Sequence, residues 1–443
     1  MEILEKAQKM LEKYPLCDHC LGRQFALLGY ELDNQRRGEA LKILLTMMGH
    51  ELTFLEKKRG LFLLKTLAIN GASEIAVGLL RKMGKRVGEK RECYLCGGRF
   101  KALPELVDKV TESLDGYEYT TFLIGIKLPI EVEEREDEFK AEFEIKYGES
   151  LRNDFSREIG KRVSAIVGRE VNYKAPDMAV LVNPFTGEVM PQANPLYIAG
   201  RYRKLARGIP QSKWLCRECN GKGCPRCNWT GKMYPESVEE IIAAPILKEA
   251  GGEDASFHAA GREDIDARML GHGRPFVLEV KKPKKRFIDL KALKETINIE
   301  AQGKVRVLNL RLTDKETVRK LKKQEAAEKA YKVVVEFDRD VSDEEMALLE
   351  KNFSGAVIRQ QTPLRVLHRR SDRVREKHIY ETKTKRLASN RIEMRIRCQG
   401  GLYIKELVTG DEGRTEPSVA SLISAKVKPL ELDVLGVIME EDL

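Results

Sequence analysis

The segment GREDIDARMLGHGRPF, Gly261 to Phe276, is the most unusual stretch of the chain. It combines two Asp, three Arg and three Gly, and it leads into an apolar run, Pro275 to Val280, that predicts a strand. A loop of this kind can hold a carboxylate among guanidinium groups, which lowers the pKa of the carboxyl and keeps it ionised. In isolation such a stretch is more often a salt-bridged surface turn, so its meaning depends on the sequence around it.

Downstream of this segment, apolar periodicity predicts alternating helices and strands to the end of the chain. Three successive valines make Tyr331–Phe337 a strong strand. In 391–398 apolar and charged residues alternate, which predicts a strand with one basic face and one buried face that includes Cys398. Helices are expected over Asp314–Glu328, with Thr313 as N-cap, and over Asp343–Asn352, with Ser342 as N-cap.

Upstream of this segment, the chain changes character near residue 100. Residues 1–99 carry helical apolar spacing, whereas 100–190 combine strand candidates at Tyr119–Leu128 and Met178–Val182 with a helix over 151–163. The acidic run Glu131–Glu138 is expected to be a solvated loop. Residues 192–235 are rich in Pro and Gly, which places the main boundary near Glu236. The expected domains are therefore 1–99, 100–235 and 236–443.

Eight of the nine cysteines form four Cys-x-x-Cys pairs. In a reducing compartment, thiolates at this spacing indicate zinc rather than disulfides. One set of four falls within twelve residues: Cys216, Cys219, Cys224 and Cys227. The other four are distant in sequence and could close a second structural site: Cys17, Cys20, Cys93 and Cys96. The alternatives are a redox or partly vacant site, or pairing between early and late cysteines.

Composition excludes several classes of protein. The chain has 443 residues, 42% hydrophobic and 33% charged, which is a globular balance. It has no uncharged apolar run of about 18 residues, so no membrane span is expected. Its N-terminus is predicted to be an amphipathic helix rather than a signal peptide, which favours a cytoplasmic protein. The formal charge of +10 suits an anionic partner.

Several motifs resemble one family of enzymes. Gly261-Arg262-Glu263-Asp264 is similar to the Gly-Arg-x-Asp motif that carries the catalytic Asp of pseudouridine synthases. The segment through Phe276 resembles the archaeal and eukaryotic tRNA pseudouridine synthase of the tenth family. Other segments resemble that family in the same order along the chain: Pro195–Arg203, Lys329–Lys332, Thr362–Arg370, Gly401–Leu407 and Gly410–Ser418. The resemblance covers nearly the whole chain.

This resemblance implies an α+β fold and a cofactor-free reaction. The catalytic domain should hold a mixed, largely antiparallel sheet with a central cleft, and the accessory region should contain an α/β, RNA-binding THUMP-like domain with zinc sites. The implied activity is isomerisation of uridine to pseudouridine in the T-loop of tRNA, at position 54, 55 or both. The target base must first be extruded from the RNA, at a cost of a few kcal/mol.

The resemblance also assigns roles to single residues. Asp264 is the expected catalytic carboxylate, and Lys405 is expected to pair with it and hold it charged and oriented. Tyr331 is expected to stack on the extruded base, and its hydroxyl could move the C5 proton. Tyr403, on the same face of a strand as Lys405, is expected to line the pocket. The remaining substrate-binding candidates are Leu432, Arg262 and Arg365.

Two basic clusters flank the expected pocket in sequence, and phosphate contact is the favoured interpretation of both. Between Leu364 and Arg397 there are twelve Lys or Arg and four Asp or Glu. The RNA-binding candidates of this cluster are Arg369, Arg370, Arg373 and Arg375, and those of the second are Lys281, Lys282, Lys284, Lys285 and Arg286. The expected partner is the elbow of tRNA, bound by a monomer.

Two alternatives remain on the sequence alone. A different tRNA-modifying enzyme could share the THUMP-like domain, but we find no phosphate loop or dinucleotide fingerprint. A non-catalytic zinc-containing tRNA-binding protein would bind RNA equally well without needing Asp264.

Overall fold

The computed structural model describes residues 2–323 and 327–438, except the side chain of Arg369. It divides into two compact units, residues 1–194 and 195–443. The main boundary therefore lies at Asn194–Pro195, and the expected boundary near Glu236 is wrong. The reason is strand β5 (Leu196–Lys204), which pairs with β7 (Arg268–Lys281) and so belongs to the second unit together with the later cysteines.

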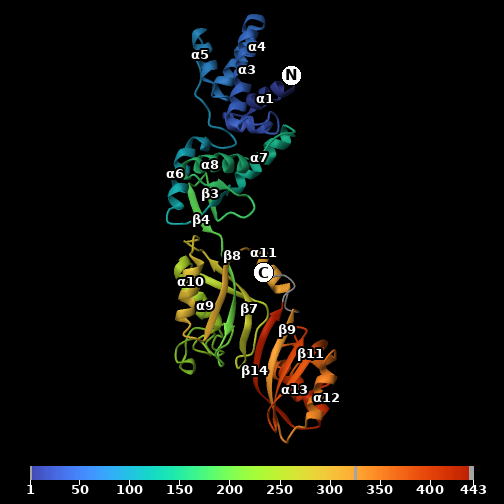
Figure 1. Ribbon diagram of the computed structural model, residues 1–443. Coiled ribbons are helices and arrows are strands. Elements are labelled where there is room, and N and C mark those ends of the chain that lie inside the picture. The colour runs from blue at the N-terminus through green and yellow to red at the C-terminus, as the bar shows by residue number, and fades with distance from the viewer. Residues whose placement is uncertain (1, 324–326, 439–443) are drawn as a thin grey trace. The chain divides into compact units, whose positions relative to one another are not determined.

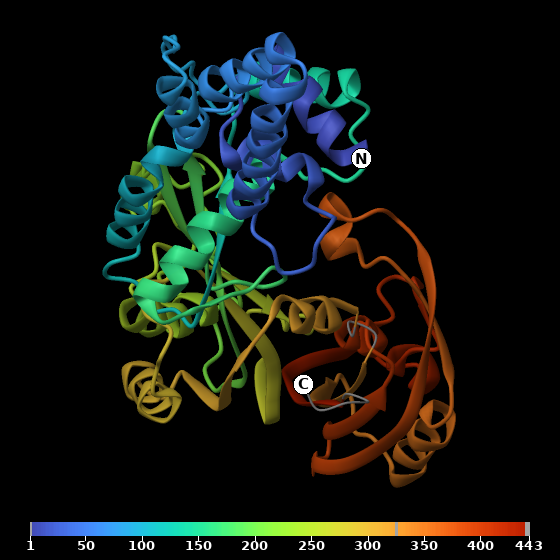
Figure 2. The ribbon, with the colours of Figure 1, turned by 90° about the horizontal axis from the view of Figure 1, so that it is seen from above.

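The first unit joins a helical bundle to a small sheet without a break in its core. One apolar cluster runs from Ala7 to Ala193, so residues 1–99 and the following α/β region pack as one body. Figure 2 shows the early helices gathered in blue. These helices are α1 (Glu2–Lys13), α2 (Asp18–Gly22), α3 (Asn34–Leu55), α4 (Lys57–Ile69) and α5 (Glu74–Lys82).

The sheet of the first unit has the order β2-β1-β3-β4. Its strands are β1 (Thr121–Ile126), β2 (Glu170–Val171), β3 (Met178–Asn183) and β4 (Glu188–Ala193), and the accompanying helices are α6 (Leu103–Ser113), α7 (Ile130–Glu142) and α8 (Leu151–Val167). Residues 131–138 lie in α7, so the solvated loop expected there is wrong. The side chain of Glu136 is buried and forms an ion pair with Arg23, which explains why an acidic run folds against the core.

The second unit is built on one large sheet with the order β13-β10-β11-β12-β9-β14-β7-β5-β8, and β6 pairs with β7. Among the described strands of this sheet, β14 and β7 form the one parallel pair, joined only at Asp433–Arg268 and Val434–Met269. The remaining strands are β6 (Asp254–Ala259), β8 (Val305–Thr313), β9 (Glu328–Phe337), β10 (Val357–Gln361), β11 (Val374–Ala388), β12 (Arg391–Cys398), β13 (Thr415–Glu416) and β14 (Val427–Ile438).

Two apolar cores divide the large sheet into lobes that meet at this parallel pair. In one lobe α9 (Val238–Ala250) and α10 (Leu290–Glu300) pack on β5, β7 and β8 (Figure 1). In the other lobe α12 (Asp343–Phe353) and α13 (Ile404–Thr409) pack on β9, β11 and β12. Tyr331 on β9 packs against both cores. The junction between the lobes is therefore the place where residues from distant parts of the chain meet.

Local structure near the junction differs from expectation in two places. The helix expected over Asp314–Glu328 is α11 (Lys315–Lys323), capped by the Asp314 side chain rather than Thr313, and Glu328 already begins β9; residues 324–326 lie outside the described structure. The helix α12 begins as expected, because Ser342 and Glu345 form a capping box. The short helix α14 (Val419–Ile423) completes this lobe. Within the described ranges, no helix is long and apolar enough to cross a membrane.

Candidate active site

The catalytic candidate Asp264 lies in the loop between β6 and β7, beside the junction of the lobes. Gly261 begins this loop with φ +75°, a conformation that favours glycine, and a Cβ there would lie 3.1 Å from the Lys329 ammonium. The amide of Ala267 donates to the Asp264 carbonyl at 3.1 Å, which closes the loop into a turn. The Asp264 side chain is 34% exposed, so its carboxylate is accessible from solvent.

Beneath the loop lies a buried polar cluster that we call the floor, made of Tyr202, Lys204, Gln211, Glu263 and Arg274. The Glu263 carboxylate accepts from the Arg274 guanidinium at 2.9 Å and from the Tyr202 hydroxyl at 3.0 Å. Gln211 donates to the same hydroxyl at 2.7 Å and to the Gly261 carbonyl at 3.0 Å. Because Glu263 and Arg274 are both buried, each is the charge partner that the other requires.

The ammonium of Lys204 holds the backbone of the loop. It donates to the carbonyls of Ile209 at 2.8 Å, Asp264 at 3.0 Å and Ile265 at 3.1 Å, and the residue is fully buried. Burial lowers the pKa of Lys204, although the charges of nearby carboxylates, led by Glu263, oppose the shift. Three carbonyl acceptors use all three protons of the ammonium, so Lys204 fixes where the Asp264 backbone lies.

Above the floor, Asp264 meets two cations from the other lobe, and we call these three residues the rim. Two guanidinium nitrogens of Arg365 lie 3.2 and 3.3 Å from the two carboxylate oxygens of Asp264. The Lys405 ammonium lies 3.5 Å from Asp264 and 2.7 Å from Asp266. The expected pairing of Lys405 with Asp264 is thus present as the longer of two contacts, and Arg365 supplies the bidentate one.

The Arg365 side chain is positioned by two further contacts, with Glu406 and Tyr403. Its Nε donates to the buried carboxylate of Glu406 at 2.6 Å, and its guanidinium lies 5.8 Å from the centre of the Tyr403 ring. Burial lowers the pKa of Arg365, but the hydrogen bond to Glu406 and the charge of Asp264 outweigh it, so the pKa is raised and the group stays charged. The same contacts fix the direction from which Arg365 approaches Asp264.

A cavity of about 210 Å³ opens at the rim. It is lined by residues of both lobes: Pro210, Gln211, Ser212, Trp214, Arg262, Glu263, Asp264, Ile265, Asp266, Arg365 and Lys405. Arg262 and Arg365, both predicted to bind substrate, therefore share this cavity with Asp264 and Lys405. The expected central cleft corresponds to this cavity at the junction of the lobes.

The other predicted pocket residues lie beside the cavity rather than on its described wall. Tyr331 is in β9; burial raises its pKa, and the charges of Cys398 and Asp264 add to the shift. Leu432 is buried in β14. Tyr403 directly precedes α13 and Lys405 is in the first turn of that helix, so the strand expected for these two residues is wrong. The Tyr403 hydroxyl accepts a hydrogen bond from Arg370 at 2.9 Å.

The two basic clusters are placed differently. In the first cluster, which is close in sequence to Arg365, the side chains of Arg370 and Arg373 are exposed. Arg375 donates to the Thr362 hydroxyl at 3.1 Å, and the side chain of Arg369 is outside the described structure. Lys281 pairs with Asp254 at 2.7 Å and Lys282 with Glu253 at 2.7 Å. Lys284 and Lys285 are exposed, whereas Arg286 is buried. Lys281 is seven residues along β7 from Arg274, roughly 23 Å, so the second cluster lies away from the cavity.

Sequence reasoning missed the floor and part of the wall. Lys204 and Gln211 precede the loop by about 50 residues or more. Lys204 ends a stretch of mixed aromatic and basic residues that suggests RNA contact or support of the cysteine-rich segment, but nothing in the local pattern links either residue to Asp264. The one sequence signal for the floor is Glu263. It stands directly before Asp264 in the Gly-Arg-Glu-Asp motif, and a carboxylate at that place needs a cationic partner such as Arg274 if it is buried. The wall residue Trp214 lies two residues before Cys216, in a segment whose sequence pattern indicates only a zinc site.

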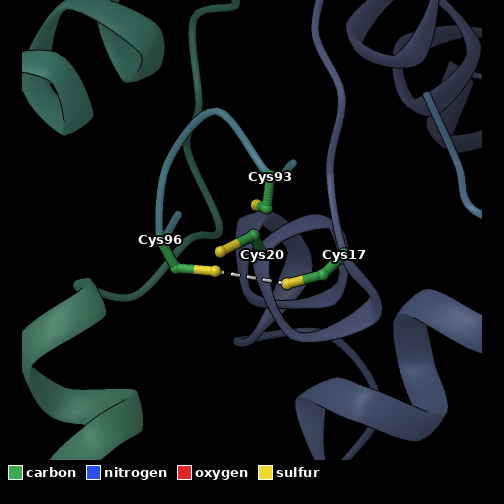
Figure 3. A group of neighbouring side chains, drawn as sticks. All are labelled: Cys17, Cys20, Cys93 and Cys96. Atoms are coloured by element: carbon green, nitrogen blue, oxygen red, sulfur yellow. Dashed lines mark hydrogen bonds between the residues drawn. The ribbon is translucent and has the colours of Figure 1, made fainter. Parts of the chain in front are cut away.

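Both predicted sets of four cysteines come together in the structure. We call Cys17, Cys20, Cys93 and Cys96 the first tetrad, and Cys216, Cys219, Cys224 and Cys227 the second tetrad. In the first unit Cys17 and Cys20 face Cys93 and Cys96, with the sulfurs turned to a common centre (Figure 3) and Cys17 Sγ 3.6 Å from Cys96 Sγ. The ligand atoms of each tetrad lie within 4.8 Å of one another. Four thiolates around zinc at 2.3 Å would stand about 3.8 Å apart, so both donor sets fit this metal.

The second tetrad also receives backbone hydrogen bonds. The amides of Cys224 and Gly231 each donate to Cys227 Sγ at 3.3 Å, and that of Gly223 donates to Cys219 Sγ at 3.2 Å. Burial opposes ionisation of the Cys227 thiol, but these amides outweigh it and lower its pKa to about 6. Amide donors of this kind favour the thiolate form of Cys227, which is the form that binds a metal.

Comparison with known proteins agrees with the sequence motifs. Residues 197–438 match the family described as Pus10, C-terminal, and residues 106–183 match the family described as Pus10 THUMP domain, archaeal. Together these matches define a pseudouridine synthase that carries a THUMP domain. Proteins named tRNA pseudouridine synthase Pus10 are 46% identical in Methanocaldococcus jannaschii, covering 99% of this chain and 94% of that protein, and 42% identical in Thermofilum pendens, covering 98% and 95%.

The chain belongs to the Pus10 family. The predicted family, the α+β fold with a THUMP domain and the enzyme class are thereby confirmed, and neither alternative from the sequence is supported. Among solved structures, a Cbf5–Nop10–Gar1 complex matches with a TM-score of 0.30 at 15% identity, over 53% of this chain and 47% of that one. That likeness is too distant to support any further conclusion.

Proposed function

We propose that this protein isomerises uridine to pseudouridine in the T-loop of tRNA, at position 54, 55 or both, with Asp264 as the essential carboxylate. The observation that carries the proposal is the rim: one accessible carboxylate, bound by two nitrogens of Arg365 and approached by Lys405, in a cavity between two lobes. The relatives that match the whole chain are named tRNA pseudouridine synthases.

The reaction breaks the N1–C1′ bond of uridine, turns the base and rejoins it through C5. Asp264 either attacks the sugar or removes a sugar proton, and both roles need a fixed, charged oxygen close to C1′ or C2′. Arg365 and Lys405 orient this oxygen, while Lys204 fixes the backbone that carries it. Tyr331 on β9 is the proposed stacking partner and the group that moves the C5 proton, supported by its position against both apolar cores at the junction of the lobes.

Binding of tRNA is proposed to use the cations around the rim. Arg370, Arg373 and Arg375 follow Arg365 closely, and contacts from such residues to phosphates position RNA without reading its sequence. The THUMP domain is proposed to make contacts of its own with the tRNA. We further propose that the protein acts in the cytoplasm, because eight paired thiols need a reducing compartment. A monomer is the oligomeric state that we propose for it.

We also propose that each tetrad holds one structural zinc ion. When bound, zinc supplies rigidity and no chemistry at Asp264, because all four positions are thiolates. Metal analysis of the purified protein should give two zinc ions per chain, and Cys20→Ser and Cys224→Ser should each reduce the value to one. A wild-type protein with one ion or none would contradict the proposal.

The decisive experiment replaces Asp264 by Ala and by Asn. Both variants should bind an unmodified tRNA transcript and yield no pseudouridine when the T-loop is mapped by chemical probing. Asp343→Asn, which alters an exposed acid on α12, is the control and should keep full activity. Unchanged product from Asp264→Ala would reject the assignment.

A further inference from the structure

One aromatic side chain on the cavity wall has no role in the mechanism above. Trp214 lines the cavity together with Asp264, Arg365 and Lys405, whereas Tyr331 is not among the described lining residues. An RNA base that leaves its stack needs a replacement surface, and aromatic side chains supply one for any base. Trp214 is the aromatic ring among the described residues that line this cavity.

The position of Trp214 is fixed by the cysteine-rich segment that follows it. Its carbonyl accepts from the Met233 amide at 2.9 Å, Leu215 bridges to Lys232, and the Cys216 amide donates to the Gly231 carbonyl at 2.8 Å. The Tyr234 ring packs edge-on against Trp214, with centroids 5.7 Å apart and an interplanar angle of 81°. The segments 214–216 and 231–233 are therefore tied together at the base of the second tetrad.

We infer that Trp214 is a substrate-binding residue that stacks on a base of the RNA at the mouth of the Asp264 cavity. The ligand class is an unstacked nucleobase of the bound RNA, and the inference rests on the proposed function of this cavity. A base entering beside Asp264 passes the wall formed by Pro210, Ser212 and Trp214, and Trp214 is the aromatic residue among those described on this wall. Loss of one such stacking contact corresponds to roughly 5- to 150-fold in affinity.

The chain offers a favourable spectroscopic test, because its two tryptophans are Trp214 and Trp229. Trp229 is 72% exposed and does not line the cavity, so Trp229→Phe serves as the matched control and leaves Trp214 as the single emitter. In the Trp229→Phe background, a T-arm hairpin RNA should quench the emission of Trp214, since stacking on a base quenches indole fluorescence. The same hairpin should leave Trp229 emission in a Trp214→Phe protein much less affected.

Kinetics separate stacking from folding. Trp214→Ala should lower kcat/KM on unmodified tRNA by about 5- to 150-fold, Trp214→Phe should retain most of it, and Trp229→Phe should match wild type. Equal activity of Trp214→Ala and wild type, or no quenching of Trp214 by the hairpin, would overturn the inference. If Trp214→Ala fails to fold, the quenching result alone decides.

Combining Trp229→Phe with Asp264→Ala distinguishes this inference from the proposed function. Quenching should persist in that protein although no product forms. Product formation by the Asp264→Ala variant would reject the catalytic assignment while leaving the quenching result to decide the role of Trp214.

Discussion

Glu263 of the floor and Asp264 of the rim are adjacent in sequence but differ in burial and in the residues that they contact. Glu263 belongs to the floor, where its buried carboxylate meets buried Arg274 and Tyr202. Asp264, the next residue, belongs to the rim, where its carboxylate is open to solvent and meets cations from the other lobe. The floor therefore sets the loop in place, and the rim presents the reactive group. The two should therefore respond oppositely to mutation.

The largest effect on stability is expected for Glu263→Ala. This change leaves the buried Arg274 guanidinium without a counter-charge, which should reduce the free energy of unfolding by about 3–5 kcal/mol. Thermal unfolding should show a Tm lower by roughly 6–20 °C, whereas Asp264→Ala should leave Tm near wild type. A Glu263→Leu, Arg274→Leu double variant should recover part of the loss, since it removes both charges. Similar Tm values for Glu263→Ala and Asp264→Ala would erase the distinction between floor and rim.

The next largest effect is expected for Lys204→Met, which should reduce the free energy of unfolding by about 2–4 kcal/mol, because it leaves buried carbonyls without their hydrogen-bond donor. The matched control is Lys405→Met on the rim, where an accessible lysine contributes little to folding. Thermal unfolding and kcat/KM, measured on both variants, should diverge: Lys204→Met loses stability, and Lys405→Met keeps Tm and loses activity. A Lys405→Met protein that unfolds as readily as Lys204→Met would contradict this division.

Within the rim, Arg365→Lys tests geometry rather than charge. A lysine cannot reproduce the two-nitrogen contact with Asp264 or hold Glu406 at the same time. We expect kcat/KM to fall about tenfold, equivalent to about 1.4 kcal/mol, with tRNA affinity little changed. Arg373→Lys, which alters an exposed arginine outside the described cavity, should keep kcat. A fall in tRNA affinity alone would assign Arg365 to RNA binding instead of orientation.

The sequence predicted the rim better than the floor because the two are encoded differently. Asp264 and Lys405 stand in short motifs, so a resemblance could locate them. The floor depends on the register of β5 against β7, which aligns Tyr202 with Arg274 and Lys204 with Met269, and no local pattern encodes that pairing. The same long-range pairing moved the domain boundary to Asn194–Pro195. For residues 131–138, burial of Glu136 against Arg23 turned an expected loop into α7, which a count of charges could not predict.

The smallest effect on stability and activity is expected at Asp433 of β14, which lies outside both the floor and the rim and contacts Arg207, Arg268 and Lys332. Burial raises the pKa of this carboxyl, but the hydrogen bond from Arg268, the charge of Arg207 and the contact with Lys332 outweigh it, so the pKa is lowered below its ordinary value. A carboxyl with a lowered pKa contributes stability above its unfolded pKa, about 3.9, and loses it as pH falls through the folded value.

The Tm difference between wild type and Asp433→Asn should therefore be constant from pH 7 to about pH 5 and shrink below about pH 4. Arg207 also donates to the Asp266 carbonyl at 2.7 Å, so Asp433 reaches the catalytic loop through this guanidinium. Activity of Asp433→Asn at neutral pH should accordingly fall less than that of Arg365→Lys, because only the support of the loop is weakened. A Tm difference that stays constant down to pH 3 would show that the carboxylate of Asp433 contributes nothing through its charge, and its support of the catalytic loop would then rest on packing alone.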